Sequence, residues 1–524
     1  MSTADPASPT QRSISASRLA LAALLLAPAG VACALTQLWP TFDTLLLSTQ
    51  DVGSFSQSSA GVGFDNYAQI FENDAFQSGL LFSGLLVLAR VLAVAVVPPA
   101  LGWALTRARG GALLRALATA PMAFFAPGAV GLACVLTLFG LRGLGLIERF
   151  TVLQDPVGAR ILVIAIDALA ALVFGVSAGV IVFGAAARST KPGRWLALAW
   201  LGMILASAAL AWQVMDLPFT LTGGGPGGGT ATPLVTAYRS GAQLMVFGPA
   251  AAATTLVLVP ILGVGLSVGL GLALARPRLE PMADVAVTPS AGAWPALAFG
   301  GAVAALAGLA LALAFVAPLV LSEPARGGVP RDEATTWFNT LVPPLVGLVI
   351  QWPLALLGGY AIGGLRPLGR HSLWLLVPFA PWLFVTPAAH ALNWLLRYQG
   401  LGLLGNWATL VPPGFSVAAL TLMALTFFGV PEAAKGRERL LPWVAALAGA
   451  LVWLSATLSD FGWQYLLAGP RETTWLIVAL QAVQRGGGLD PSTWLALLAP
   501  TVLIGLALTA LAAAFGARFR IGRA

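Results

Sequence analysis

Long apolar runs alternate with short polar stretches along nearly the whole chain. Runs of about 18 apolar residues or more recur, and each can cross the hydrocarbon core of a bilayer as a helix. By length and flanking residues we count about twelve such segments. Their approximate ranges are 19–39, 79–105, 113–140, 161–187, 195–216, 246–275, 294–321, 338–364, 372–395, 413–430, 440–463 and 492–516. The pattern predicts an all-α integral membrane protein.

The composition agrees with this pattern. Of the 524 residues, 58% are hydrophobic and 9% are charged, whereas a soluble domain carries about 25% charged residues. Cys33 and Cys134 both lie in apolar runs, so we expect no disulfide framework. The first run, 19–39, has no small-residue cleavage site after it and is long enough to stay as an anchor.

The basic residues are unevenly distributed. A net charge of +8 and an isoelectric point of about 10.3 would suit a nucleic-acid-binding protein, but Lys and Arg gather in alternate loops. The basic loops lie near Arg107, Lys191, Arg276, Arg366 and Lys435. Because such residues favour the cytoplasmic side, we predict a multi-pass protein of the cell membrane with both termini in the cytoplasm. The excess positive charge is then expected to interact with lipid head groups, and no nucleic acid partner is expected.

One loop stands out for its glycine content. It reads Leu221-Thr222-Gly223-Gly224-Gly225-Pro226-Gly227-Gly228-Gly229-Thr230. Glycine is costly inside a helix and proline removes a backbone donor, so this segment is predicted to be non-helical, with positive backbone angles at Gly224 and Gly225. Non-helical backbone at membrane depth needs cover from protein or from a water-filled cavity. A flexible surface turn is the simpler alternative.

Ionisable residues are scarce inside the predicted spans. Arg90 and Asp167 are the two that we single out, and such residues usually face a cavity or a partner. We expect a structural ion pair, with a substrate or proton role as the alternative. His390 is predicted to be a hydrogen-bonded core residue. With two His residues and no Cys pair, we expect no metal site and no other cofactor.

Motifs for catalysis and nucleotide binding are missing from the sequence. It contains no GxxxxGK[ST] loop, and Lys occurs only at Lys191 and Lys435. No recognisable nucleophile–base set occurs either, so we do not expect an enzyme. Energy for transport would have to come from a partner chain or from none.

The chain divides into two similar parts. Asp216 lies ten residues before Pro226, and Asp460 lies ten residues before Pro470, each at the end of an apolar segment. Several matches of this kind in the same order favour an internal duplication, on which transporter folds are commonly built. The predicted division is a cytoplasmic tail 1–18, a first half 19–275, a linker 276–293 and a second half 294–524.

The glycine-rich loop resembles the LTGGGP-x-x-x-T loop of carbohydrate-type ABC importer permeases. Residues 63–120 are similar to the start of the larger maltose-type permease subunit, and residues 338–442 to the smaller one, so the chain resembles a fusion of both. The resemblance implies two six-helix halves around a central pathway for a small polar solute such as a sugar. It also implies a solute-binding protein on the extracytoplasmic side, near the loop, and an ATPase dimer in the cytoplasm.

The sequence departs from that family at the loops that couple a permease to its ATPase. Family members carry an EAA-x-x-x-G loop in each half that folds into a coupling helix. At the corresponding place in the first half, Arg188 and Lys191 lie in a turn too short for a separate helix. The second half keeps a shortened version, Glu432-Ala433-Ala434-Lys435-Gly436. Two alternatives therefore stay open: a permease-derived scaffold or receptor without ATP-coupled transport, and an ion-coupled secondary transporter.

Overall fold

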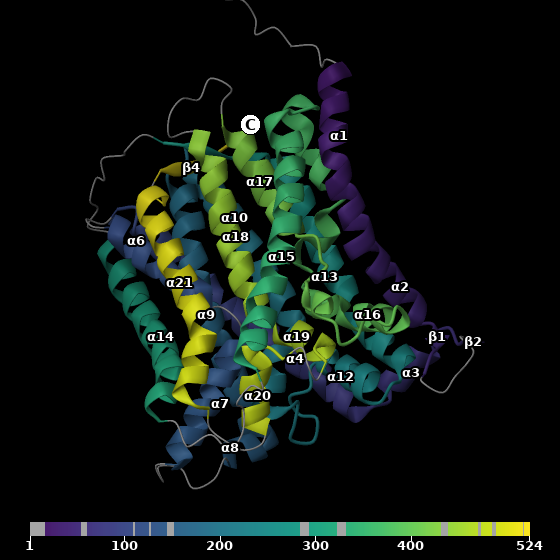
Figure 1. Ribbon diagram of the computed structural model, residues 1–524. Coiled ribbons are helices and arrows are strands. Elements are labelled where there is room, and N and C mark those ends of the chain that lie inside the picture. Colours follow the sequence, from purple (N-terminus) through teal and green to yellow (C-terminus); the bar gives the residue numbers. More distant parts are fainter. Residues whose placement is uncertain are drawn as a thin grey trace, which may run out of the picture.

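The computed structural model is a bundle of apolar helices (Figure 1). It describes residues 16–53, 60–107, 111–124, 127–143, 151–282, 293–321, 332–430, 439–469, 473–484, 489–516 and 518–523. Within these residues, nine helical stretches are long and apolar enough to cross a membrane. The all-α class is confirmed, and the bundle has the character of a membrane-embedded protein.

The long stretches consist of single helices or of helices joined end to end. They contain α1 (Ala16–Cys33) with α2 (Trp39–Leu47), α4 (Asp74–Ala95) with α5 (Val97–Ala104), α9 (Pro156–Ala187), α10 (Pro192–Trp212), α13 (Phe247–Ala275), α14 (Trp294–Val320), α15 (Glu333–Gly359), α18 (Leu441–Leu458) and α21 (Pro491–Phe515). Short π-helical segments at Ala34–Leu38 and Tyr360–Gly364 join α1 to α2 and extend α15.

Shorter elements fill the spaces between these helices. The short helices are α3 (Asp65–Phe71), α6 (Gly111–Thr119), α7 (Pro127–Gly143), α8 (Thr151–Gln154), α11 (Asp216–Thr222), α12 (Pro233–Tyr238), α16 (Pro387–Gly400), α17 (Val417–Gly429), α19 (Phe461–Leu467) and α20 (Trp475–Gln484). A further 3₁₀ turn spans Trp407–Leu410. The strands are β1 (Gln50–Asp51), β2 (Ala60–Gly61), β3 (Pro277–Pro281) and β4 (Phe519–Arg523), paired antiparallel as β1–β2 and β3–β4.

Two of the predicted spans are interrupted by 3₁₀ segments. The range 113–140 holds α6, a 3₁₀ turn at Ala120–Phe124 and then α7. The range 372–395 holds two 3₁₀ segments followed by α16. The breaks coincide with Pro121 and Pro127 in the first range, and with Pro378, Pro381 and Pro387 in the second. Proline lacks the amide donor and clashes with the preceding turn, so the prediction of unbroken helices is wrong here.

The same order of elements occurs twice along the chain. Each predicted half contains a proline-broken segment, at α6–α7 in the first and at the 3₁₀ segments with α16 in the second. Later, a short helix, a loop and another short helix precede a long helix: α11, α12 and α13 in the first part, and α19, α20 and α21 in the second. Asp216 begins α11, and Asp460 caps the start of α19.

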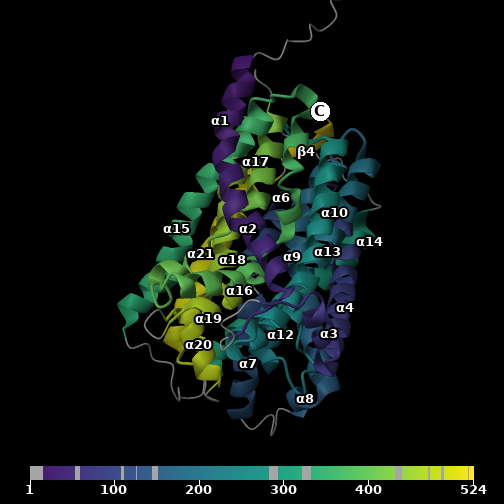
Figure 2. The same cartoon turned by 90° about the vertical axis from the view of Figure 1, so that its right-hand side faces the viewer.

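The bundle has two distinguishable ends. The start of helix α1 and strand β4 lie at the same end of the bundle, which we call the terminal end (Figures 1 and 2). Helices α8 and α20 lie at the opposite end, which we call the loop end. The shared position of α1 and β4 agrees with an even number of crossings. That the terminal end faces the cytoplasm stays a prediction.

Candidate functional site

The glycine-rich loop at 223–232 is folded back onto the bundle at the loop end. Gly223 ends α11 in the left-handed conformation at φ +61°, and Gly224 follows at +85°. The fully buried Thr230 donates its hydroxyl to Gly225 O at 2.8 Å, and its oxygen lies 2.5 Å from that of Thr222. This loop is therefore no free surface turn. The predicted positive backbone angle holds at Gly224 and is wrong at Gly225.

Two arginines hold the two sides of this loop. Arg239, in the π-helical turn Arg239–Gln243 that follows α12, donates to Gly223 O. Arg160, near the start of α9, donates its Nε proton to Gly229 O at 2.6 Å and also contacts Ser78. Neither guanidinium forms an ion pair with an acidic side chain in the described part of the chain. Neither residue was predicted from the sequence, where their positions just outside the predicted spans were the available signal.

A cavity of about 380 Å³ lies beside this loop. Its walls come from both parts of the chain, with apolar side chains of α7 and α20 making much of the surface. Of the predicted loop residues, Leu221 and Gly223 line it. The polar lining residues are Thr220, Arg239, Gln243, Tyr465 and Gln484. This volume is near the lower end of the usual range for small-molecule sites.

An aromatic cluster joins the two parts of the chain next to the cavity. Phe219 and Tyr238 come from α11 and α12, and Phe461 and Tyr465 come from α19. Neighbouring ring centroids in the cluster are 5.1 to 5.8 Å apart, at the usual spacing for aromatic pairs. Phe219 and Tyr465 also line the cavity, so these rings form part of its wall.

Two carboxyl groups meet at the start of α19, near these rings. Asp216 Oδ1 accepts a hydrogen bond from Gly462 N at 3.0 Å, and Asp460 Oδ1 accepts one from Trp463 N at 3.0 Å. The sequence analysis noted that the two aspartates occupy corresponding places. That both side chains bind backbone amides at the start of α19 was not predicted from the sequence.

Arg90 and Asp167 form a buried ion pair between α4 and α9. Arg90 Nε donates to Asp167 Oδ2 at 3.0 Å, and the side chains are 3% and 1% exposed. Neither residue lines the cavity. His390 is also buried and contacts Gln37 through the ring Nε2 at 3.2 Å. Among the described residues, no group of three or more His, Cys, Asp or Glu could hold a metal ion.

At the terminal end, the first predicted coupling turn is engaged by the chain's own tail. Helix α9 ends at Ala187 and α10 begins at Pro192. Arg188 donates to Gly516 O at 3.2 Å and to Phe519 O at 3.1 Å. Burial, and then the charge of Arg115, lower the pKa of Arg188 to about 10, which leaves it protonated at neutral pH. Lys191 is exposed.

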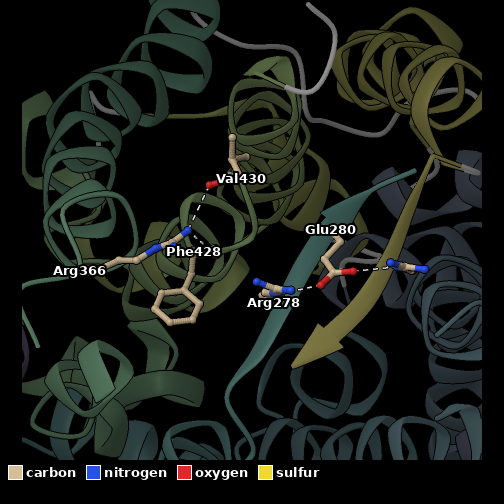
Figure 3. A network of polar contacts seen from close by, with 6 residues as sticks. Arg278, Glu280, Arg366, Phe428 and Val430 are labelled. Carbon is tan, nitrogen blue, oxygen red and sulfur yellow. Dashed lines mark hydrogen bonds and ion pairs between the residues drawn. The ribbon is translucent and has the colours of Figure 1, made fainter. Parts of the chain in front are cut away.

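The ladder of β3 and β4 connects this turn to the second predicted coupling site. Figure 3 shows Glu280 beside Arg278, both on β3. The Glu280 carboxylate lies 2.6 Å from Arg278 Nε and 2.8 Å from Arg520 Nε of β4. Partial burial alone would raise the pKa of Glu280, but the hydrogen bonds and charges of the two arginines hold it below the ordinary value. Strand β4 packs against α9, and β3 packs against α17.

The end of α17 is held by a further arginine. Arg366 donates to Phe428 O at 2.9 Å and to Val430 O at 3.1 Å, and its guanidinium lies over the Phe428 ring (Figure 3). The predicted coupling residues of the second half follow directly. They are Glu432, Ala433, Ala434, Lys435 and Gly436, and they lie outside the described residues.

Comparison with known proteins gives no match for this chain: no protein-family model matches it, and no curated protein matches it.

Proposed function

We propose that the chain is the membrane-spanning permease subunit of a binding-protein-dependent ABC importer. The solute is a small polar molecule such as a sugar, and a separate ATPase supplies the energy. One observation carries the proposal: a cavity of sugar-binding size has walls from both parts of the chain and is bordered by the glycine-rich loop that resembles the permease loop. Transporter sites commonly lie between two repeats of the fold.

The repeated order of elements supports a design of two fused permease subunits. Nine long helical stretches cover most of the predicted spans. The proposal of twelve crossings assigns the other three to the broken ranges 113–140 and 372–395 and to α17. The extracytoplasmic partner, a solute-binding protein, would dock at the loop end. The partners at the terminal end would be ATPase subunits.

A second candidate function is a permease-derived scaffold or receptor that does not carry out ATP-driven transport. The observation in its favour is the four-residue turn 188–191, in which Arg188 is bound to the chain's own C-terminal tail. Such a turn offers little surface to a partner ATPase. The ion-coupled alternative depended on Arg90 and Asp167, which pair with each other away from the cavity, so we do not pursue it.

Co-purification distinguishes the two candidates. The full-length chain is tagged, extracted in detergent from the membranes of its own cells, and analysed by mass spectrometry. The importer proposal expects an ATPase with a GxxxxGK[ST] loop in the complex, and ATP hydrolysis that rises when solute and solute-binding protein are added. Purification of the chain without an ATPase, together with solute uptake that does not respond to ATP, would favour the scaffold.

A further inference from the structure

We infer that the cavity takes an acidic solute: a molecule of about sugar size that carries one carboxylate. This inference rests on the proposed function, because it takes the cavity to be part of the solute pathway. It adds the charge of the solute, which the proposed function does not specify.

The charge of the cavity wall is the first observation. Among the described lining residues, Arg239 is the charged one, and the others are apolar or neutral and polar. Its guanidinium donates to the Gly223 carbonyl, and its remaining donors have no acceptor in the described part of the chain. Arg239 is partly buried in a largely apolar wall and forms no ion pair among the described residues, so an anionic ligand gains more there than in open water.

The neutral polar groups supply the second observation. Gln243 and Gln484 carry amides, and Thr220 and Tyr465 carry hydroxyls. The Thr220 hydroxyl already donates to Leu217 O at 3.1 Å, and Tyr465 and Gln243 hydrogen-bond to Tyr238, so their remaining donor and acceptor positions face the ligand. These groups suit the hydroxyls of a polyol or sugar ring. The aromatic faces of Phe219 and Tyr465 give the same wall a flat apolar part. The lining thus combines one cationic position with several hydroxyl-binding positions.

The ligand charge follows from the single cation among the described lining residues. One guanidinium matches one carboxylate through paired hydrogen bonds. A phosphate group carries about −1.5 to −2 charges at neutral pH and would leave part of that charge unmatched. Asp216 and Asp460 lie near the aromatic cluster but do not line the cavity, so neither carboxyl group contacts a molecule bound there.

Equilibrium binding to the full-length chain in neutral-lipid nanodiscs tests the inference without any ATPase or solute-binding protein. The probes are radiolabelled glucuronate, glucose and glucose 6-phosphate. Glucuronate and glucose share the pyranose ring and differ at one carbon, where a carboxylate replaces a hydroxymethyl group. We expect glucuronate to bind about tenfold more tightly than glucose, the ratio for one net charged hydrogen-bond interaction.

Variants assign that preference to one residue. Arg239→Gln should bring the glucuronate-to-glucose affinity ratio to about 1, and Arg239→Lys should keep several-fold preference. Arg160→Gln is the matched control: it also loses a bond to the loop but does not line the cavity. It should weaken both probes alike and leave the ratio unchanged.

Four results would overturn the inference: equal affinity for glucose and glucuronate, no binding of either, tighter binding of glucose 6-phosphate than of glucuronate, or a preference that persists in Arg239→Gln. Failure of the proposed function would look different. If glucuronate binds with the expected preference but no ATPase co-purifies and ATP drives no uptake, the site stands and the importer proposal fails. If ATP drives uptake of glucose with no preference for the acid, the importer stands and this inference fails.

Discussion

At both ends of the bundle, arginine side chains donate to backbone carbonyls, but the backbone that they hold differs between the ends. At the loop end, Arg160 and Arg239 donate to carbonyls of a glycine-rich loop, and a cavity of about 380 Å³ lies beside it. At the terminal end, Arg188 and Arg366 also donate to backbone carbonyls, but there a strand ladder joins the linker to the C-terminal tail.

The difference comes from the backbone that each end offers. The glycine-rich loop forms no strand ladder. The carbonyls of Pro226 and Gly228 accept backbone bonds within the loop, whereas those of Gly223 and Gly229 accept bonds from Arg239 and Arg160, which fix the loop beside the cavity. Strands β3 and β4 satisfy much of their backbone by pairing, with Pro277 opposite Arg523 and Pro281 opposite Phe519. If the pathway opens alternately at the two ends, the β3–β4 ladder would therefore have to move at the terminal end and the glycine-rich loop at the loop end.

The largest expected effect concerns which end faces outward. With Cys33 and Cys134 replaced by Ala, a cysteine at Ala334, which is exposed at the start of α15 at the loop end, should react with an impermeant thiol reagent added to intact cells. A cysteine at Lys191, exposed at the terminal end, should react only after the cells are permeabilised. The reverse labelling pattern would contradict the proposed orientation, in which the loop end faces outward and the terminal end faces the cytoplasm.

The next effect tests whether the ladder is fastened to α17. A Cβ at Gly429 would lie 1.8 Å from Leu279 O, so Gly429→Ala must push β3 away. We expect a loss of about 1–3 kcal/mol in stability, as for overpacked sites, and faster hydrogen exchange at the β3 amides. Gly263→Ala is the matched control, because nothing lies within 4 Å of its added Cβ. Equal exchange in both variants would mean that the ladder is not held by this contact.

A smaller effect is expected at the loop. Gly224 has φ +85°, and an added Cβ would lie 2.9 Å from Val235 Cγ1, so Gly224→Ala should cost about 1–2 kcal/mol. Gly225→Ala makes an ordinary contact at 3.4 Å and lacks the positive angle, so its effect should be much smaller. Thermal unfolding of the detergent-purified variants measures the difference. Equal midpoints would show that the loop conformation is not under this constraint.

The smallest expected effect is the pH dependence of the ladder. Because the folded-state pKa of Glu280 lies below its ordinary value of 4.5, its contribution is complete above that value and is lost as the pH falls through the folded pKa. The pair is partly exposed, so we expect no more than about 1 kcal/mol. Protection factors of the β3 amides, which correct for the pH dependence of intrinsic exchange, should fall on acidification in the wild type. In Glu280→Gln they should be lower at neutral pH already and change less with acid.

Several features follow from the sequence alone. Helical structure follows from apolar runs because a bilayer provides no partners for an unpaired backbone, so each segment must satisfy its own. The non-helical loop from Gly223 onward follows from glycine and proline chemistry, and so does the positive angle at Gly224, whereas Leu221 and Thr222, predicted to be non-helical, belong to α11. In 113–140 and 372–395 the prolines predict breaks, whereas the length of the apolar runs alone predicts continuous spans.

Other features were decided by tertiary structure, because they join residues far apart in the chain. Arg520 pairs with Glu280 across 240 positions, and two five-residue polar segments carry no periodic signal that predicts their pairing. Likewise, Arg239 was one of many basic loop residues until the fold placed it in a cavity wall with residues of α19 and α20. Hydropathy reports whether a segment prefers lipid, and packing between segments alone determines which side chains share a cavity.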